Sequence, residues 1–317
     1  MAVFVVRRLL LLVVAFFVAS ILIFLLLRLL PGDLARAIGG VEASPERIEA
    51  LRQRLGLDRP LYRQYTDWMG GVLQFDFGRS VLNNSTVTSE LGKKLSVTAP
   101  LLLASTVLAV AVAVPLGIVA AARHRRFDGV ALSATSQLGI AVPSFVVGLF
   151  LIVFLAVKRH WFPAFGFPTA GWSDTGRALK SLVLPSFTLA LSQGAVLFRF
   201  VRSAVLDVLH QDYIRTARAK GLTRTQALFR HGLRNAALPI VAILGVQIAS
   251  LIAGVVVIER VFTLPGVGQM LVKDIQGRDL DKVQGTLLIL ATIVLVVGFL
   301  VDVLQRVIDP RLREHRR

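Results

Sequence analysis

The chain has 317 residues, of which 55% are hydrophobic, and its mean hydropathy of +0.70 lies above that of an ordinary soluble domain. The formal net charge is +17, but the basic residues are divided among short segments and do not form one stripe interleaved with aromatic residues, which argues against a nucleic-acid partner. Cysteine is absent from the sequence, which excludes disulfides, thiol redox chemistry and cysteine-based metal sites.

Long apolar blocks follow one another along the chain, each near the length of about 20 residues that a helix needs to cross a membrane. They predict an all-α polytopic membrane protein with six transmembrane helices, near Leu9–Leu30, Pro100–Ala122, Val130–Val157, Leu182–Val201, Leu238–Ile258 and Thr286–Val307. Pro143 interrupts the third block and Pro185 opens the fourth, so we expect kinks at both places.

The first block could also be a signal peptide, because Arg7 and Arg8 precede it. Its apolar run exceeds the ~7–15 residues of a signal core, and no small-x-small cleavage site follows it. These two features favour a retained helix.

Lysine and arginine in the short connecting segments predict the orientation of the six helices. With the N-terminus inside, the inner segments hold eighteen basic residues and the two short outer loops hold seven. The basic side of short loops stays cytoplasmic, whereas the long loop at 31–96 is exempt from this rule because of its length. We therefore expect both termini to be cytoplasmic.

The long outer loop is predicted to form two short helices. Ser44, Pro45 and Glu46 are typical of an N-cap, a first helical position and an acidic first turn, and apolar residues then recur at helical spacing until Gly56. A second segment has one apolar face, made by Leu61, Tyr65, Trp68 and Val72. We expect these helices on the outer membrane surface, where they pack on the helix bundle or also help to dock an external partner.

Neither an active site nor an energy-converting site is found in the sequence. It contains no G-x-x-x-x-G-K-[ST] phosphate cradle, no H-E-x-x-H site and no hydrolase triad, and its five histidines are too scattered for a metal site. Proton or sodium coupling would need ionisable groups deep inside the spans, but those present lie towards helix ends: Arg28, Arg199, Glu259, Arg260 and Asp302. We expect a chain that is not an enzyme and binds no cofactor or metal. If ATP hydrolysis drives its function, the ATPase must be another chain.

The inner segment 212–239 is predicted to form a helix, a turn and a second helix. Gly221 suits the left-handed position that ends a helix. Thr223, with Gln226 three residues later, matches a capping box, and Pro239 leads into the fifth span. A passive basic loop that only follows the positive-inside rule needs no such ordered pair of helices. The segment is therefore predicted to dock a partner.

Small side chains just before the turn, Ala217 and Ala219, would let a partner surface approach closely. The basic side chains around them offer charged contacts, namely Arg215, Arg218, Lys220 and Arg224. The predicted contact residues are Arg215, Thr216, Ala217, Arg218, Ala219, Lys220, Gly221 and Leu222.

Six motifs, in order along the chain, carry a family resemblance. They are Leu30-Pro-Gly-Asp33, Leu55-Gly-Leu-Asp-Arg-Pro-Leu61, Ala217-Arg-Ala-Lys-Gly-Leu222, Arg230-His-Gly-Leu-Arg-Asn-Ala236, Val261-Phe-Thr-Leu-Pro-Gly266 and Asp309-Pro-Arg311. With them the chain resembles, over nearly its whole length, the inner-membrane permease subunits of bacterial ABC importers, in the dipeptide, oligopeptide and nickel branch. The general importer signature is E-A-A-x-x-x-G followed, after nine residues, by I-x-L-P. Ala217, Gly221 and Leu233 match it, whereas other residues stand at its remaining positions: Arg215, Thr216, His231 and Arg234.

The resemblance implies a type I ABC importer permease fold and a bacterial inner-membrane location. Its implied domains are an N-terminal transmembrane helix (1–31), an extracytoplasmic helical loop domain (32–93), the permease core (94–306) and a basic cytoplasmic tail (307–317). The implied partners are a homologous second permease subunit, two cytoplasmic ATPase subunits that bind ATP and Mg, and an extracytoplasmic solute-binding protein. Segment 212–239 would supply a coupling helix that sits in a cleft of an ATPase subunit. Dipeptides, oligopeptides, nickel chelates and glutathione-like molecules pass through this branch, and specificity resides largely in the binding protein.

Polar residues in the later spans are candidates for lining a solute path: Ser133, Gln137, Ser186, Gln193, Gln247 and Ser250. Small and amide-bearing residues are also the usual contacts between membrane helices, so packing is the alternative role for each of them.

Two other functions remain open at this stage. An ATP-independent secondary carrier or channel would be expected to show inverted repeats and discontinuous helices, and no convincing repeat is present. A membrane scaffold protein without a transported solute is the second alternative.

Overall fold

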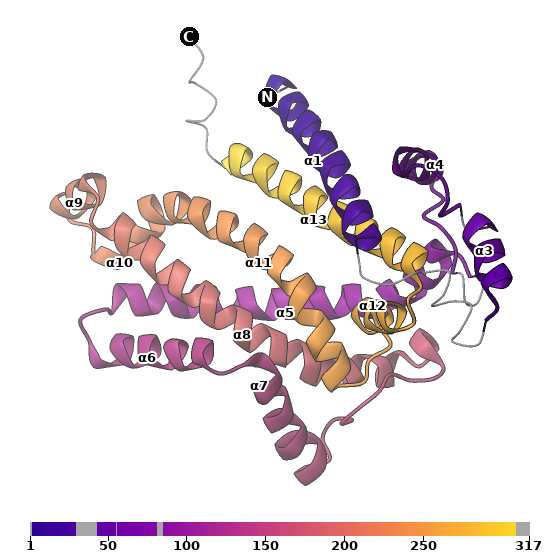
Figure 1. Cartoon of the computed structure of the whole chain (residues 1–317). Helices are drawn as coiled ribbons and strands as arrows, with labels where there is room; N and C mark the ends of the chain where they lie inside the picture. Colours follow the sequence, from indigo (N-terminus) through magenta and orange to yellow (C-terminus); the bar gives the residue numbers. More distant parts are fainter. Residues whose placement is uncertain (1, 30–42, 55, 81–84, 309–317) are drawn as a thin grey trace. The chain divides into compact units, whose positions relative to one another are not determined.

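The computed structural model describes residues 2–29, 43–54, 56–80 and 85–308, and these ranges are almost entirely helical (Figure 1). The α-helices are α1 (Ala2–Arg28), α3 (Pro45–Arg54), α4 (Leu61–Leu73), α5 (Val87–Ala122), α6 (Phe127–Ala141), α7 (Ser144–Leu151), α8 (Thr175–Leu209), α9 (Asp212–Ala219), α10 (Arg224–Ala227), α11 (Leu233–Val261), α12 (Val267–Gln276) and α13 (Leu280–Ile308). Two π-helical segments, η1 (Ile152–Lys158) and η3 (Leu228–Gly232), extend α7 and join α10 to α11, and η2 (Gly171–Ser173) is a short 3-10 turn.

Within the described ranges, five helical runs are long and apolar enough to cross a membrane: α1, α5, α8, the run from α10 to α11, and α13. The pair made by α6 and α7 with η1 is bent by 98° at Val142 and Pro143, and it makes a sixth span when its two parts are counted together. The bend has a local cause, because the helical region is disfavoured for a residue before proline, and Val142 is extended at φ −86° and ψ 124°. The predicted kink at Pro143 and the six-span fold are confirmed.

Several helices begin earlier than the apolar blocks do. α5 begins at Val87, α8 at Thr175 and α13 at Leu280, well before Pro100, Leu182 and Thr286. Their first turns are polar, so hydropathy does not register them. At α8 the start is set by Asp174, whose Oδ1 accepts a hydrogen bond of 3.2 Å from the Arg177 amide. α8 then continues through Pro185.

Some of the predicted features lie outside the described residues. These are the end of the first span at Leu30, the motifs at 30–33 and 309–311, Leu55, and the tail beyond residue 308.

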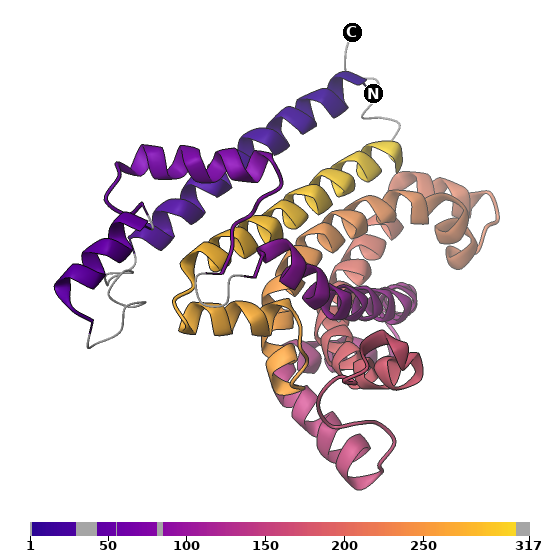
Figure 2. The same ribbon diagram turned by 90° about the vertical axis from the view of Figure 1, so that its right-hand side faces the viewer.

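The chain divides into two compact units. One comprises Met1–Val5, Val97–Gly268 and Val297–Arg317, and the other comprises Val6–Ser96 and Gln269–Val296. The first has a core between α5, α8, α9 and α11 that includes Leu197, Val201 and Leu228. Gly117 lets α5 approach α8 closely, because a Cβ there would lie 2.8 Å from Cγ1 of Val201. Figure 2 shows α8 and the α9 to α10 turn of this unit from a second side.

In the second unit, both helices predicted for the 31–96 loop are present as α3 and α4. Ser44 caps α3, and Gly56 follows its end at φ +64°. α4 packs on α1 through aromatic contacts, with the Tyr65 and Trp68 rings 5.5 and 6.3 Å from the Phe24 ring. The buried face of α4 is completed by Met69 and Val72, which pack with Leu288 of α13. Leu61, predicted to share this face, is 53% exposed because it begins the helix, before these contacts.

Candidate functional site

The candidate site is the turn between α8 and α11 that contains α9 and α10. α9 is held to the bundle by its apolar side, where Ile214 and Ala217 are only 1% and 8% exposed and pack in the core beside Leu228. Its first turn is tied to α11, because the Asn235 amide donates a hydrogen bond of 2.9 Å to the Tyr213 hydroxyl. The short helix therefore has a fixed position on the longer ones.

The end of α9 is a complete Schellman motif. Gly221 has φ +95°, its amide donates to the Arg218 carbonyl at 3.0 Å, and the Leu222 amide donates to the Ala217 carbonyl at 3.3 Å. A Cβ on Gly221 would meet nothing within 4 Å, so glycine is required by the backbone and not by crowding. The predicted role of Gly221 as the residue that ends the helix is confirmed.

α10 begins with the predicted capping box. The Gln226 amide donates to the Thr223 hydroxyl at 3.3 Å, and the Thr223 amide donates to the Gln226 side-chain oxygen at 3.0 Å. Where α11 starts, Gly232 is needed for packing, since a Cβ there would lie 2.8 Å from Cγ1 of Val208. Hydrogen bonds or close packing therefore fix the turn at the end of α9, at the start of α10 and at the start of α11.

The predicted contact residues divide between two faces of the turn. Six of them are exposed, namely Arg215, Thr216, Arg218, Ala219, Lys220 and Gly221, whereas Leu222 is half-buried and Ala217 is buried. Ala217 therefore faces the bundle and fixes α9, which leaves Ala219 as the small residue open to a partner. The only ion pair that the structure gives to the described part of this face, between Arg215 and Asp212 at 3.4 Å, is exposed and weak. The face is basic overall.

The structure joins two of the six candidate lining residues, Gln247 and Gln193, and does not group all six in one place. Gln247 is buried, and its side-chain amide donates a hydrogen bond of 3.0 Å to the Gln193 carbonyl, which joins α11 to α8. Ser133 and Ser250 donate to carbonyls of their own helices, at Gly129 and Val246. An apolar cavity of about 450 Å³ between α5, α6 and α8 is lined by none of the six.

The two remaining candidates differ in exposure. Gln137 is exposed, whereas Ser186 is buried and its hydroxyl has no hydrogen-bond partner among the described residues.

A buried carboxylate near the end of α11 was not recognised as a structural centre from the sequence. Glu259 is fully buried and accepts a hydrogen bond of 2.5 Å from the Thr98 hydroxyl of α5, which in turn accepts one of 2.9 Å from the Val267 amide. The Leu264 amide donates to the Glu259 carbonyl at 2.8 Å. A Cβ on Gly266 would lie 1.9 Å from Glu259 Oε1. The motif at 261–266 thus surrounds this carboxylate. Its last residue, Gly266, was the signal available in the sequence, because a residue with a Cβ there would clash with the Glu259 side chain.

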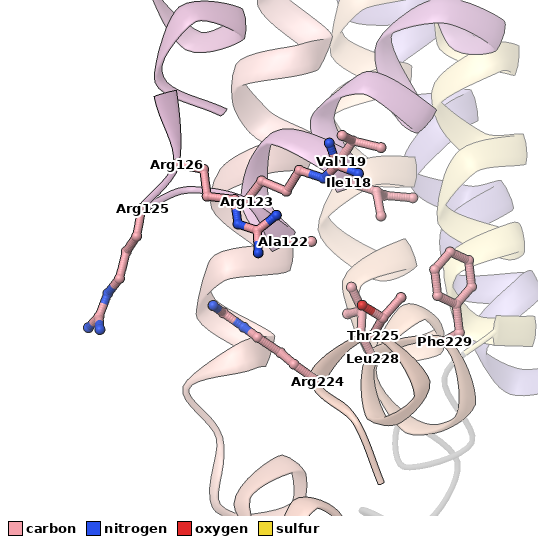
Figure 3. Close-up of a pocket in the computed structure, with 10 residues that line it drawn as sticks. All are labelled: Ile118, Val119, Ala122, Arg123, Arg125, Arg126, Arg224, Thr225, Leu228 and Phe229. Carbon is pink, nitrogen blue, oxygen red and sulfur yellow. The ribbon is translucent and has the colours of Figure 1, made fainter. Parts of the chain in front are cut away.

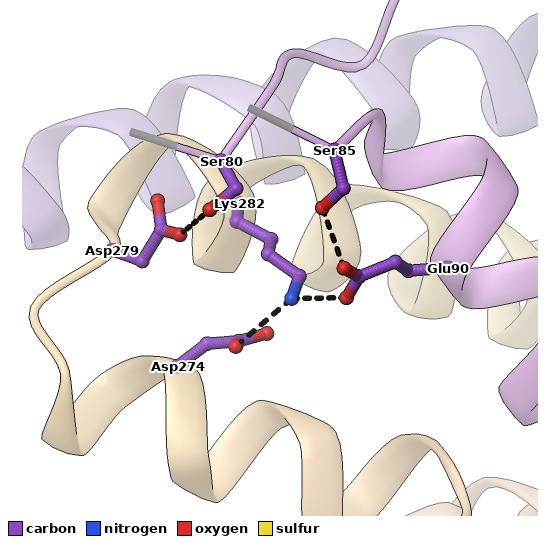
Figure 4. Close-up of polar contacts among 6 residues, drawn as sticks. All are labelled: Ser80, Ser85, Glu90, Asp274, Asp279 and Lys282. Carbon is purple, nitrogen blue, oxygen red and sulfur yellow. Dashed lines mark hydrogen bonds and ion pairs between the residues drawn. The ribbon is translucent and has the colours of Figure 1, made fainter. Parts of the chain in front are cut away.

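The second unit also contains a buried cluster of charges (Figure 4). The Lys282 ammonium group pairs with the carboxylates of Glu90 and Asp274, the latter at 3.1 Å. Ser85 donates to Glu90, and Ser80 donates to Asp279, both at 2.5 Å. Burial raises the pKa of the Asp274 carboxyl, and the Lys282 ammonium group opposes that shift. Because a charge removed from water needs a partner of opposite sign, these ion pairs hold the start of α5 and the start of α13 against α12.

Comparison with known proteins gives this architecture a family. Residues 113–314 match the family model described as binding-protein-dependent transport system inner membrane component, and residues 1–102 match the model for the N-terminal part of such membrane components. The chain belongs to this family. Together the two matches confirm the predicted resemblance and a multi-pass location in the inner membrane.

Two curated relatives cover nearly the whole chain. The glutathione transport system permease protein GsiC of Escherichia coli (strain K12) is 38% identical over 310 residues, which are 98% of each chain. The oligopeptide transport system permease protein AppB of Bacillus subtilis (strain 168) is 38% identical over 314 residues, which are 98% of this chain and 99% of that one. The family member described here is thus similar to permease subunits along its full length.

A solved structure of the MetNI methionine ABC transporter, in inward-facing conformations, has the same fold. The TM-score is 0.55 at 17% sequence identity, and the match covers 70% of this chain and 97% of that one. This match confirms the predicted ABC importer permease fold.

Proposed function

We propose that this permease subunit is one half of the translocation pathway of an ATP-driven importer for peptides or related small solutes, and that it is coupled to ATP hydrolysis through segment 212–239. The observation that carries the coupling role is the turn with a Schellman motif on one side and a capping box on the other, which presents an exposed basic face on α9. The solute class is supported by the named glutathione and oligopeptide permeases.

In the proposed assembly, two cytoplasmic ATPase subunits bind ATP and Mg, and a homologous second permease completes the pathway. A solute-binding protein delivers the solute from outside. Both termini and the tail at 307–317 are cytoplasmic, and the loop domain at 32–93 is extracytoplasmic, as the distribution of basic residues supports. The permease core is the segment 94–306.

When nucleotide binding closes the ATPases, a displacement of α9 is passed to α8 and α11 through the buried Ile214 and Ala217 side chains. Of the candidate lining residues, Gln137 and Ser250 are exposed and are the ones we propose for contact with solute. The solute that is carried, whether a dipeptide, an oligopeptide, a nickel chelate or a glutathione-like molecule, would be selected largely by the binding protein.

Charge reversal on the exposed face of α9 tests the coupling role. In the assembled transporter in nanodiscs, Arg218→Glu should reduce ATP hydrolysis stimulated by loaded binding protein by about tenfold, because it places a negative charge at the proposed contact. Arg230→Glu is the matched control, since Arg230 is also an exposed arginine of the same cytoplasmic segment but lies on η3. Equal stimulation in both variants and the wild type would remove the coupling role.

Reconstitution separates this proposal from the carrier or channel alternative. The chain alone in liposomes should show no solute uptake under a proton or sodium gradient, and uptake should require the ATPase subunits and ATP. Ion-driven uptake by the chain alone would favour a secondary carrier. A chain whose behaviour no binding protein or solute changes would favour a scaffold.

A further inference from the structure

A pocket rich in arginine lies between the end of α5, the start of α6 and α10 (Figure 3). It has a volume of about 570 Å³ and belongs wholly to the first compact unit. Four arginines line it, namely Arg123, Arg125, Arg126 and Arg224, together with an apolar group that includes Ile118, Val119, Leu228 and Phe229. Figure 3 shows the arginines towards one side and the Phe229 ring at the other, so the pocket has a charged end and an apolar end.

The charged end carries an excess of positive charge. Arg123 is paired with Asp128, with 2.7 Å between Nη1 and Oδ2, which offsets one of the four charges. Arg224 points an Nη2 at the ring of His124, 3.3 Å from Nδ1, and that contact brings no negative charge. The lining residues include no aspartate or glutamate. Arg125, Arg126 and Arg224 therefore have no carboxylate partner among the residues that line the pocket, and Figure 3 shows the Arg125 side chain extending away from the other three arginines.

The apolar end is open to the surroundings. The Phe229 side chain is 59% exposed although it follows the fully buried Leu228, and Phe127 beside Arg126 is 88% exposed. Exposed phenylalanine beside arginine is found on helices that lie at the membrane interface, where the apolar side chains enter the boundary between headgroups and acyl chains and the basic side chains stay in the polar layer.

The position of the pocket along the spans fits that level. The span of α5 ends at Ala122, the bent third span begins at Phe127, and the run from α10 to α11 begins at Arg224. Arg123, Arg125 and Arg126 thus lie between the end of one apolar helix and the start of the next, where lipid headgroups begin, and Arg224 lines the same pocket from the start of α10. On the predicted orientation this is the cytoplasmic side.

We propose that this pocket binds the phosphate headgroup of an anionic phospholipid, with the arginines donating to phosphate oxygens and Phe229 lying against the glycerol and the start of the acyl chains. A guanidinium group presents paired donors that match phosphate oxygens, and basic pockets between membrane helices suit lipid headgroups. A zwitterionic lipid would bind less well, because its ammonium group would add positive charge to a site that already has an excess. An acidic surface of an ATPase subunit is the competing occupant, but it would leave the apolar end unmatched.

Native mass spectrometry of the full-length permease tests the proposal. The protein is released from mixed micelles that contain equal amounts of phosphatidylglycerol and phosphatidylcholine, and retained lipids are counted. Wild type should retain phosphatidylglycerol in clear preference, and Arg126→Gln combined with Arg224→Gln should reduce that preference by about tenfold or more. Arg230→Gln combined with Arg234→Gln is the matched control, because both residues are exposed arginines of the same cytoplasmic segment outside the pocket. The control should keep the wild-type preference.

Three results would overturn the proposal. The first is an equal loss of preference in the pocket and control variants, which would mean a general effect of charge. The second is displacement of the bound lipid by inorganic phosphate at millimolar concentration, which would mean a free-anion site. The third is loss of ATPase co-purification in the pocket variant with lipid retention unchanged, which would mean a protein contact.

A second variant covers the case in which the pocket variant fails to fold. Arg126→Lys combined with Arg224→Lys keeps the charge and loses the paired donors, so it should give a weaker preference for phosphatidylglycerol than wild type does. A preference equal to that of wild type would contradict the role of the guanidinium geometry.

Discussion

Replacement of Gly221 by alanine should loosen α9 without disturbing any side-chain packing. The backbone there has φ +95°, which costs an L-residue about 1–2 kcal/mol, and the added methyl group meets nothing within 4 Å, so no clash adds to that cost. A loss of that size corresponds to about a 5–30-fold increase in the population in which the end of α9 is open. Gly221→Asn should cost less, because asparagine is tolerated in the left-handed region.

Amide hydrogen exchange of the purified permease in nanodiscs measures this population. The amides of residues 215–219 should exchange about 5–30-fold faster in Gly221→Ala, while those of α11 stay unchanged. Gly70→Ala is the matched control, since Gly70 also has free space around its Cβ position but a helical backbone, and it should be neutral or stabilising. Unchanged exchange in Gly221→Ala, or the same acceleration in Gly70→Ala, would refute the argument that the left-handed cap holds α9.

Two further changes test the buried polar centres by thermal unfolding in detergent. Gly266→Ala should lower the melting temperature, because the added methyl group forces the Glu259 carboxylate away from the Thr98 hydroxyl at a cost of about 1–3 kcal/mol. Gly176→Ala is the control and should not lower it, since a Cβ at Gly176 would meet nothing nearer than 4.0 Å. Equal melting temperatures in the two variants would mean that the carboxylate has room to move. Lys282→Met should destabilise by about 3–5 kcal/mol, because it leaves the buried Asp274 and the half-buried Glu90 without their counter-ion. The exposed Lys273→Met should change the melting temperature little. A small effect of Lys282→Met would indicate that water reaches the carboxylates.

Local signals in the sequence predicted the features that depend on neighbouring residues. Gly221, the pair Thr223 and Gln226, and Pro143 each act within one turn of helix, and the structure confirms all of them. The six spans were predictable for a similar reason, since each apolar block is long enough to mark its own span, although the polar first turns of α5, α8 and α13 lie outside the blocks.

Features that depend on distant partners could not be predicted. Thr98 and Glu259 are 161 residues apart, so their hydrogen bond has no local pattern. Lys282 was counted only as a charge of an outer loop, and its pairing depends on how α12 and α13 place it beside Glu90. The Ala217 side chain faces the bundle because α9 packs on it. The positions of small and basic residues in the sequence do not indicate which side of α9 is packed.

The two contacts at the ends of α11 have a consequence for the way in which motion passes through this subunit. Near its start, the Asn235 side chain fixes it to α9, and near its end Glu259 fixes it to Thr98. A helix of 29 residues is about 43 Å long, which exceeds the thickness of a hydrocarbon core. α11 is therefore long enough to cross the hydrocarbon core and is anchored at both ends, so a shift imposed on α9 would reach the loop around Glu259 as a change in the position of the whole helix.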